Sequence, residues 1–246
     1  MKIAIGTRFW GLDPEKDLPR LAAWTEGALS VSSLVFVAVN VDADKTETIK
    51  FLREKFPSIT VIPVTPWGKF VMPLNALVLA AIGSGADSIL FASAEFPPSK
   101  QVVDGLAFYL TKSTLVVGAR LPEHDFNEAL NENANGKQVP WNAYSLWNLK
   151  ILALTGFLLI GDSPFDPDNA GVEELTTIAT LQYLTYNRAD AILLAVDGIP
   201  GEWDTRGWSA ARHVAHEKKM ASKVERPAAQ MKCLGPNLKA VVHHVG

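Results

Sequence analysis

The chain has 246 residues, of which 48% are hydrophobic and 20% charged, so it can fill one large core. A formal net charge of −3 argues against a protein that binds the phosphate backbone of nucleic acids. The one cysteine, Cys233, excludes an intrachain disulfide and a cysteine-built zinc site. Because the chain lacks a signal-peptide pattern and any run of about 18 apolar residues, we expect a cytoplasmic protein without a membrane span.

The first half of the chain alternates short apolar runs with stretches of helical periodicity. This order predicts parallel strands joined by right-handed crossovers. We therefore expect an α/β fold, a three-layer α/β/α sandwich around a mostly parallel central sheet. The expected strands are 2–6, 34–39, 59–64, 88–92 and 115–119, and the expected helices are 14–29, 45–55, 73–82 and 99–110.

The second half of the chain is less regular. Residues 120–140 are polar and rich in asparagine, which predicts a surface loop near the site. The elements expected after it are a strand at 156–160, a helix from about 172, a strand at 191–196 and a basic helix at 208–223. We assign residues 1–223 to a single domain and 224–246 to a C-terminal tail or arm, in which 239–245 has the pattern of an edge strand.

Two acidic features are candidates for a functional site. Ser93 and Glu95 follow the expected strand 88–92, and ligands of open α/β sheets collect where strands end at their carboxyl side. Glu173 and Glu174 open an expected helix, where the helix dipole favours carboxylates. The plain alternatives are a solvated strand end and a stabilised helix start.

The order of these parts resembles the GT-A fold of family 2-like glycosyltransferases over about residues 1–196. In that family a first loop wraps the nucleotide, an acidic loop lies near the base, and a strand ends in an Asp-x-Asp motif. A Gly-Phe pair and an acidic pair that opens a helix follow later. The stretches that carry the resemblance here are 3–8, 39–44, 68–75, 85–95, 148–157 and 171–175.

The resemblance implies a donor, an acceptor and a set of site residues. The donor would be a nucleotide-diphosphate sugar, and the sugar would pass to a hydroxyl acceptor with inversion. Glu174, or its neighbour Glu173, would be the base that deprotonates the acceptor. The residues implied to hold the nucleotide sugar are Thr7, Arg8, Asp42, Lys69, Ser93 and Glu95.

The strand-end motif departs from the family pattern. Asp-x-Asp holds Mg²⁺ or Mn²⁺ against the diphosphate, whereas here Ser93 and Glu95 stand in its place. Three outcomes stay open. Glu95 holds a metal with help from phosphate and water, or Lys69 and Arg8 neutralise the diphosphate without a metal, or the protein is a non-catalytic relative that binds sugar nucleotides.

Aromatic and basic side chains in the later part of the chain have two interpretations each. Five tryptophans either stack on a sugar or pack in the core: Trp67, Trp141, Trp147, Trp203 and Trp208. One face of the expected basic helix is either solvated or clamps the diphosphate: Arg212, His216, Lys219 and Lys223. A nucleotidyltransferase shares the three-layer architecture and stays an alternative. The chain lacks P-loop, dinucleotide-binding and Gly-x-Ser-x-Gly motifs, which counts against the enzymes that use them.

Overall fold

One sheet forms the centre of the molecule. The computed structural model describes residues 1–10, 14–41, 46–203, 209–235 and 237–246. In this part of the chain the sheet has nine strands in the order β3-β2-β1-β4-β7-β5-β8-β9-β6. The strands are β1 (Ile3–Phe9), β2 (Val35–Asn40), β3 (Thr60–Val64), β4 (Ser88–Ala92), β5 (Thr114–Ala119), β6 (Leu130–Asn131), β7 (Tyr144–Asn148), β8 (Asp190–Leu194) and β9 (Val242–Val245).

The first four strands form a parallel block that confirms the expected alternation of strands and helices. β1 pairs in parallel with both β2 and β4, and β2 pairs in parallel with β3. All residues of β2 and β4 are buried, as expected for strands covered on both faces. β1 continues to Phe9, so Thr7 and Arg8 lie on the strand itself and not on a loop after it.

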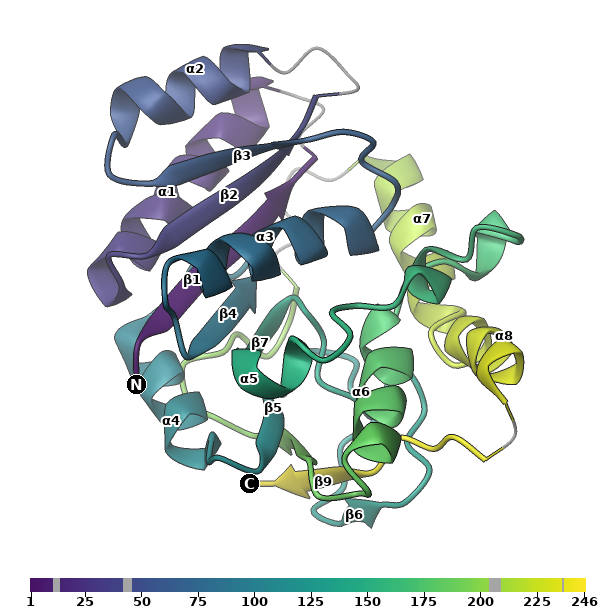
Figure 1. Ribbon diagram of the computed structural model, residues 1–246. Coiled ribbons are helices and arrows are strands. Elements are labelled where there is room, and N and C mark those ends of the chain that lie inside the picture. Colours follow the sequence, from purple (N-terminus) through teal and green to yellow (C-terminus); the bar gives the residue numbers. More distant parts are fainter. Residues whose placement is uncertain (11–13, 42–45, 204–208, 236) are drawn as a thin grey trace.

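Helices cover both faces of the sheet, and the fold class is the expected one. In Figure 1, α3 crosses in front of the sheet and α1 runs behind it. Ser99 caps α4 and Ser209 caps α7, as each side chain accepts a hydrogen bond from the backbone three residues on. The helices are α1 (Pro14–Val31), α2 (Thr46–Lys55), α3 (Val71–Gly83), α4 (Lys100–Tyr109), α5 (Leu149–Leu152), α6 (Glu173–Leu184), α7 (Ala210–Ala221) and α8 (Glu225–Leu234), with 3₁₀ turns η1 (Leu159–Asp162) and η2 (Pro167–Asn169). Among the described residues, none of these helices is both long and apolar enough to cross a membrane.

The strand expected at 156–160 is wrong, and β7 takes the corresponding place in the sheet. β7 lies antiparallel between β4 and β5. The backbone of Phe157 is hydrogen-bonded by a side chain and not by a neighbouring strand. The Asn75 amide accepts from Phe157 N at 2.8 Å and donates to Phe157 O at 2.9 Å. Gly156 turns the chain there with φ +65°. An apolar run alone therefore did not distinguish a strand from a buried turn.

The expected C-terminal tail or arm, residues 224–246, instead packs as part of the fold. β9 pairs in parallel with β8 and antiparallel with β6, so it is an inner strand and not an edge. The Gln182 side chain accepts from Val241 N and donates to Val241 O, both at 2.8 Å. α8 contacts α6 and η2, and its Gln230 donates to Gly171 O at 2.9 Å. Polar side chains make these contacts, which explains why the hydrophobic pattern did not predict them.

The loop expected at 120–140 contains the short strand β6 and is tied to the C-terminal segment. Ala134 N donates to Ala240 O at 2.9 Å, and His244 N donates to Ala129 O at the same distance. The loop leads into residues 141–143, which connect two parts of the site described below.

Candidate functional site

A large cavity opens at the carboxyl ends of β1 and β4. Its volume is about 1230 Å³. Its walls come from the ends of β1 and β4, residues 67–70, residues 142–143, the start of α1 and one side of α7. Five of the six residues expected to bind the nucleotide sugar line it: Thr7, Arg8, Lys69, Ser93 and Glu95. The sixth, Asp42, lies outside the described residues.

Three residues that line this cavity have buried polar atoms without hydrogen-bond partners. Thr7 and Ser93 lie near the carboxyl ends of the neighbouring strands β1 and β4, which pair with Gly6 opposite Phe91. Within the described part of the chain, Thr7 Oγ1, Ser93 Oγ and Trp203 Nε1 are buried and have no partner. Because buried polar groups are normally satisfied, these atoms are suited to bind a ligand or water.

Residues Asn142 and Ala143 connect the strand end to the acidic pair. Ser93 N donates to Ala143 O at 2.9 Å. Asn142 Nδ2 donates to Glu173 Oε1 at 3.3 Å, and Asn142 N donates to Glu174 Oε1 at 2.5 Å. The strand end at Ser93 and the acidic pair at the start of α6 are distant in the sequence, but they lie in one region of the molecule. Asn142 was not predicted, because a lone asparagine after a tryptophan carries no sequence signal.

The Asn142 side chain is held in place by two residues of β7, Ser145 and Trp147. Its Oδ1 accepts from Trp147 Nε1 at 2.9 Å and from the Ser145 hydroxyl at 3.2 Å. This fixes which side of the amide donates to Glu173. Trp147 is fully buried, so the hydrophobic core of β7 orients a polar group of the cavity wall.

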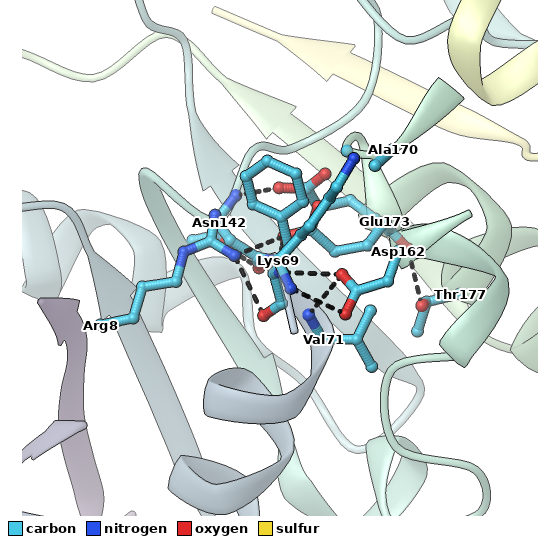
Figure 2. A network of polar contacts seen from close by, with 12 residues as sticks. Arg8, Lys69, Val71, Asn142, Asp162, Ala170, Glu173 and Thr177 are labelled. Carbon is cyan, nitrogen blue, oxygen red and sulfur yellow. Dashed lines mark hydrogen bonds and ion pairs between the residues drawn. The ribbon is translucent and has the colours of Figure 1, made fainter. Parts of the chain in front are cut away.

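Glu173 accepts hydrogen bonds from two side chains of the cavity wall, Arg8 and Asn142. Arg8 Nη1 donates to Glu173 Oε1 at 3.1 Å and to Phe70 O at 3.2 Å (Figure 2). Glu173 is only 2% exposed and begins α6, where the helix dipole favours its charge. Gly161 packs against it so closely that an added Cβ would lie 2.5 Å from the Glu173 Cβ.

Glu174 is also buried, and neither glutamate itself lines the cavity. Burial and the charge of Glu173 raise its pKa, while Lys223 and the Asn142 backbone oppose this shift. Burial also lowers the pKa of Lys223, whose ammonium lies 3.3 Å from the centroid of the Trp141 ring. We call Arg8, Asn142, Glu173, Glu174 and Lys223 the floor cluster.

Helix α3 begins beside the cavity, and its N-terminus is already occupied by a carboxylate. Asp162 accepts from the backbone N of Lys69 at 3.2 Å, of Phe70 at 2.7 Å and of Val71 at 2.9 Å (Figure 2). These are donors that a helix start can offer to an anion. The Lys69 ammonium donates to Pro167 O. Asp162 was not predicted as a site residue, because its partners lie more than 90 positions away.

Charged side chains of α1 and α7 close the other side of the cavity. Glu95 Oε1 lies 3.7 Å from Arg20 Nη1 and 3.5 Å from Arg212 Nη2. We call these three residues the arginine wall. Arg212, His216 and Lys219 of the expected basic helix all line the cavity, so this face of α7 is directed at the site.

Lys219 adds another cation to this side. In the described part of the chain no carboxylate lies within ion-pair distance of it, and its ammonium is 5.8 Å from the centroid of the Phe70 ring. The residue as a whole is exposed, but protein atoms around the ammonium displace water and lower its pKa. The positive charges of Arg8 and Arg226 lower that pKa further, while the carboxylates of Glu173 and Glu95 oppose the shift.

The tryptophans divide between the core and the cavity. Trp141 and Trp147 are buried, so the packing interpretation is correct for them. Trp67 and Trp203 line the cavity, and Trp208 lies outside the described residues. Trp10 was not predicted; it is 48% exposed at the cavity, and its ring centroid lies 5.8 Å from that of Trp67.

Solved structures share this architecture. The mannosyltransferase PcManGT from Pyrobaculum calidifontis, in complex with GDP-Man and Mn²⁺, matches 93% of this chain with a TM-score of 0.62 and 12% identity. Glucosyl-3-phosphoglycerate synthase from Mycobacterium tuberculosis, in complex with UDP, matches 96% with a TM-score of 0.53 and 12% identity. TarS 1–349 from S. aureus matches 81% with a TM-score of 0.52 and 14% identity. The chain has the GT-A fold.

The lengths of these proteins differ from that of this chain. The chain spans 59% of the TarS fragment, 64% of the mannosyltransferase and 81% of the synthase. Comparisons with protein families and with curated proteins find no match. At these identities the likeness concerns the fold, and the expected resemblance to GT-A proteins is confirmed at that level.

The residues at the strand end of this GT-A fold do not fit a divalent cation. Such a cation takes several oxygen ligands, often carboxylates. Ser93 offers a neutral hydroxyl, and the carboxylate of Glu95 is paired with Arg20 and Arg212. Within the described ranges, no three His, Cys, Asp or Glu side chains gather in an arrangement that could hold a metal ion. The expectation that Glu95 holds Mn²⁺ or Mg²⁺ therefore finds no supporting set of ligands there.

Proposed function

We propose that the cavity binds a nucleotide-diphosphate sugar and that the protein transfers the sugar to a hydroxyl acceptor. The observation that supports this proposal is the link through Asn142 and Ala143, which connects the strand end at Ser93, in the cavity wall, to the carboxylate of Glu173 directly behind that wall. The GT-A fold and the presence of nucleotides in two of its solved relatives support it.

The proposed binding residues are those that line the cavity and have atoms suited to the donor. Thr7 and Ser93 have unpartnered hydroxyl groups, and Arg8 and Lys69 have positive charges. Trp10, with an exposed indole beside Trp67, offers a flat apolar surface on which a nucleotide base stacks. We retain Asp42 as a proposed contact of the nucleotide.

The proposed reaction is an inverting displacement at the anomeric carbon. The acceptor oxygen forms the new bond to that carbon while the bond between the carbon and the diphosphate oxygen breaks. The electron pair leaves with the diphosphate, and the acceptor proton passes to a carboxylate base. Glu173 is better placed than Glu174, since it contacts two residues that line the cavity.

Calorimetric titration with UDP-, GDP- and dTDP-sugars, followed by measurement of nucleotide diphosphate release, tests the proposal. We expect one of these donors to bind and to be turned over. Glu173→Gln should lower the rate by about 100-fold with donor affinity little changed, because it removes the base. Glu54→Gln, an exposed glutamate of α2, is the matched control and should keep full activity.

Three outcomes would contradict this proposal or part of it. If no nucleotide sugar binds, the proposal fails as a whole. If a donor binds but is never consumed, the protein is a sugar-nucleotide binder, the alternative that Ser93 in place of aspartate favours. If neither Glu173→Gln nor Glu174→Gln lowers the rate, the assignment of the base is wrong.

A further inference from the structure

We infer that Arg20, Arg212 and Lys219 hold the donor diphosphate in place of a divalent cation, and that Glu95 neutralises the two arginines until the donor binds. This inference rests on the proposed function and concerns the same cavity. It would make nucleotide binding independent of metal, which the GT-A fold alone does not imply.

The charges that line the cavity are the first reason. Among the described residues of its wall, five basic side chains stand against two carboxylates: Arg8, Arg20, Lys69, Arg212 and Lys219 against Asp17 and Glu95. Arg8 is also paired with Glu173 behind the wall, and Arg20 is paired with Asp17 as well as Glu95. Each phosphate of a diphosphate diester carries one negative charge. The diphosphate can therefore be neutralised by side chains of this chain.

The geometry of Glu95 is the second reason. Its carboxylate approaches guanidinium groups from two different helices, Arg20 of α1 and Arg212 of α7, at 3.7 and 3.5 Å. Its side chain is 33% exposed, and ion pairs so exposed to water contribute little stability. A ligand with two charged phosphates can replace a single carboxylate there, because guanidinium groups bind phosphate oxygens in pairs.

The neighbouring anion sites are the third reason. The backbone N–H groups at the start of α3 already bind Asp162, and Arg8 already binds Glu173. Lys219 has no such carboxylate among the described residues, and it lies on the same face of α7 as Arg212. Arg20, Arg212 and Lys219 line the cavity, and a diphosphate that contacts them leaves the bonds of Asp162 and the Arg8–Glu173 pair intact.

Titration of the full chain with UDP and GDP, in buffer with excess EDTA and in buffer with Mn²⁺, tests the inference. We expect the better of the two nucleotides to bind with the same affinity, within about twofold, in both buffers. Arg20→Gln and Arg212→Gln should each weaken binding by about tenfold, since each removes a charge-assisted contact to phosphate. Lys50→Gln, an exposed lysine of α2 away from the cavity, should leave the affinity unchanged.

Glu95→Gln separates the two roles of this residue. If Glu95 occupies the arginines, the variant should bind the nucleotide several-fold more tightly in EDTA. If Glu95 holds a metal, the variant should lose binding that depends on Mn²⁺.

The outcomes also separate this inference from the proposed function. Binding only in the presence of Mn²⁺, or unchanged affinity in both arginine variants, would overturn the inference and leave the proposed function standing. Binding in neither buffer would instead count against the proposed function. Circular dichroism of each variant confirms that it is folded before its affinity is compared.

Discussion

The floor cluster and the arginine wall carry charges of both signs in or directly behind the wall of one cavity, but water reaches them very differently. Glu173, at the centre of the floor cluster, is 2% exposed and bound by Arg8 and Asn142 at hydrogen-bond distance. Glu95, at the centre of the arginine wall, is 33% exposed and its arginines lie at 3.5 Å or more. The floor cluster is thus buried in the structure, whereas the ion pairs of the arginine wall are open to water, as the proposed exchange of Glu95 for a diphosphate requires.

The largest effect on stability is expected from the floor cluster. Glu173→Gln keeps the shape of the side chain but removes the charge that faces Arg8, and it should lower the free energy of unfolding by about 3 kcal/mol. Urea unfolding measures this value. The exposed Glu54→Gln should change it by less than about 0.5 kcal/mol. Equal effects of the two substitutions would show that burial of Glu173 does not set the strength of the floor cluster.

A buried histidine beside the floor cluster gives a smaller effect that depends on pH. His124 accepts from Leu121 N at 2.9 Å through Nδ1, so its Nε2 carries the proton that is donated to Val139 O. Burial, and then the charge of Lys223, lower its pKa from 6.5 to about 3. Protonation therefore favours the unfolded chain, and the stability that this histidine contributes is complete above pH 6.5 and is lost as the pH falls towards 3.

Urea unfolding between pH 7 and pH 5 measures that loss. We expect His124 to lower the free energy of unfolding by up to about 1.4 kcal/mol for each pH unit below 6.5. His124→Gln should remove this part of the slope, while substitution of the exposed His243 should leave it intact. An unchanged slope in His124→Gln would mean that other groups cause the acid sensitivity.

The smallest effect on stability is expected from the arginine wall. Arg20→Gln removes two partly exposed ion pairs, with Glu95 and with Asp17, so the free energy of unfolding should change by less than about 1 kcal/mol. The same variant is expected to weaken nucleotide binding, as described above. A loss of stability comparable to that of Glu173→Gln would show that the arginine wall is structural and would remove the contrast with the floor cluster.

Much of the fold and part of the site follow from local patterns in the sequence. The strands of the first half and the helix that starts at Glu173 were predictable, because apolar runs and capping residues report on neighbours a few positions away. The strand end at Ser93 and Glu95 could be placed at the ligand-binding edge of a parallel sheet for the same reason.

Only the tertiary structure decided the partners of these residues. The antiparallel place of β7, the position of β9 inside the sheet and the contact of Asp162 with the start of α3 all join segments that are distant in the chain. The same holds for Glu95, which the sequence suggested as a metal ligand and which pairs with Arg20 and Arg212. Periodicity and caps are local properties, whereas the partner of a charged side chain depends on which remote segments the folded core brings beside it.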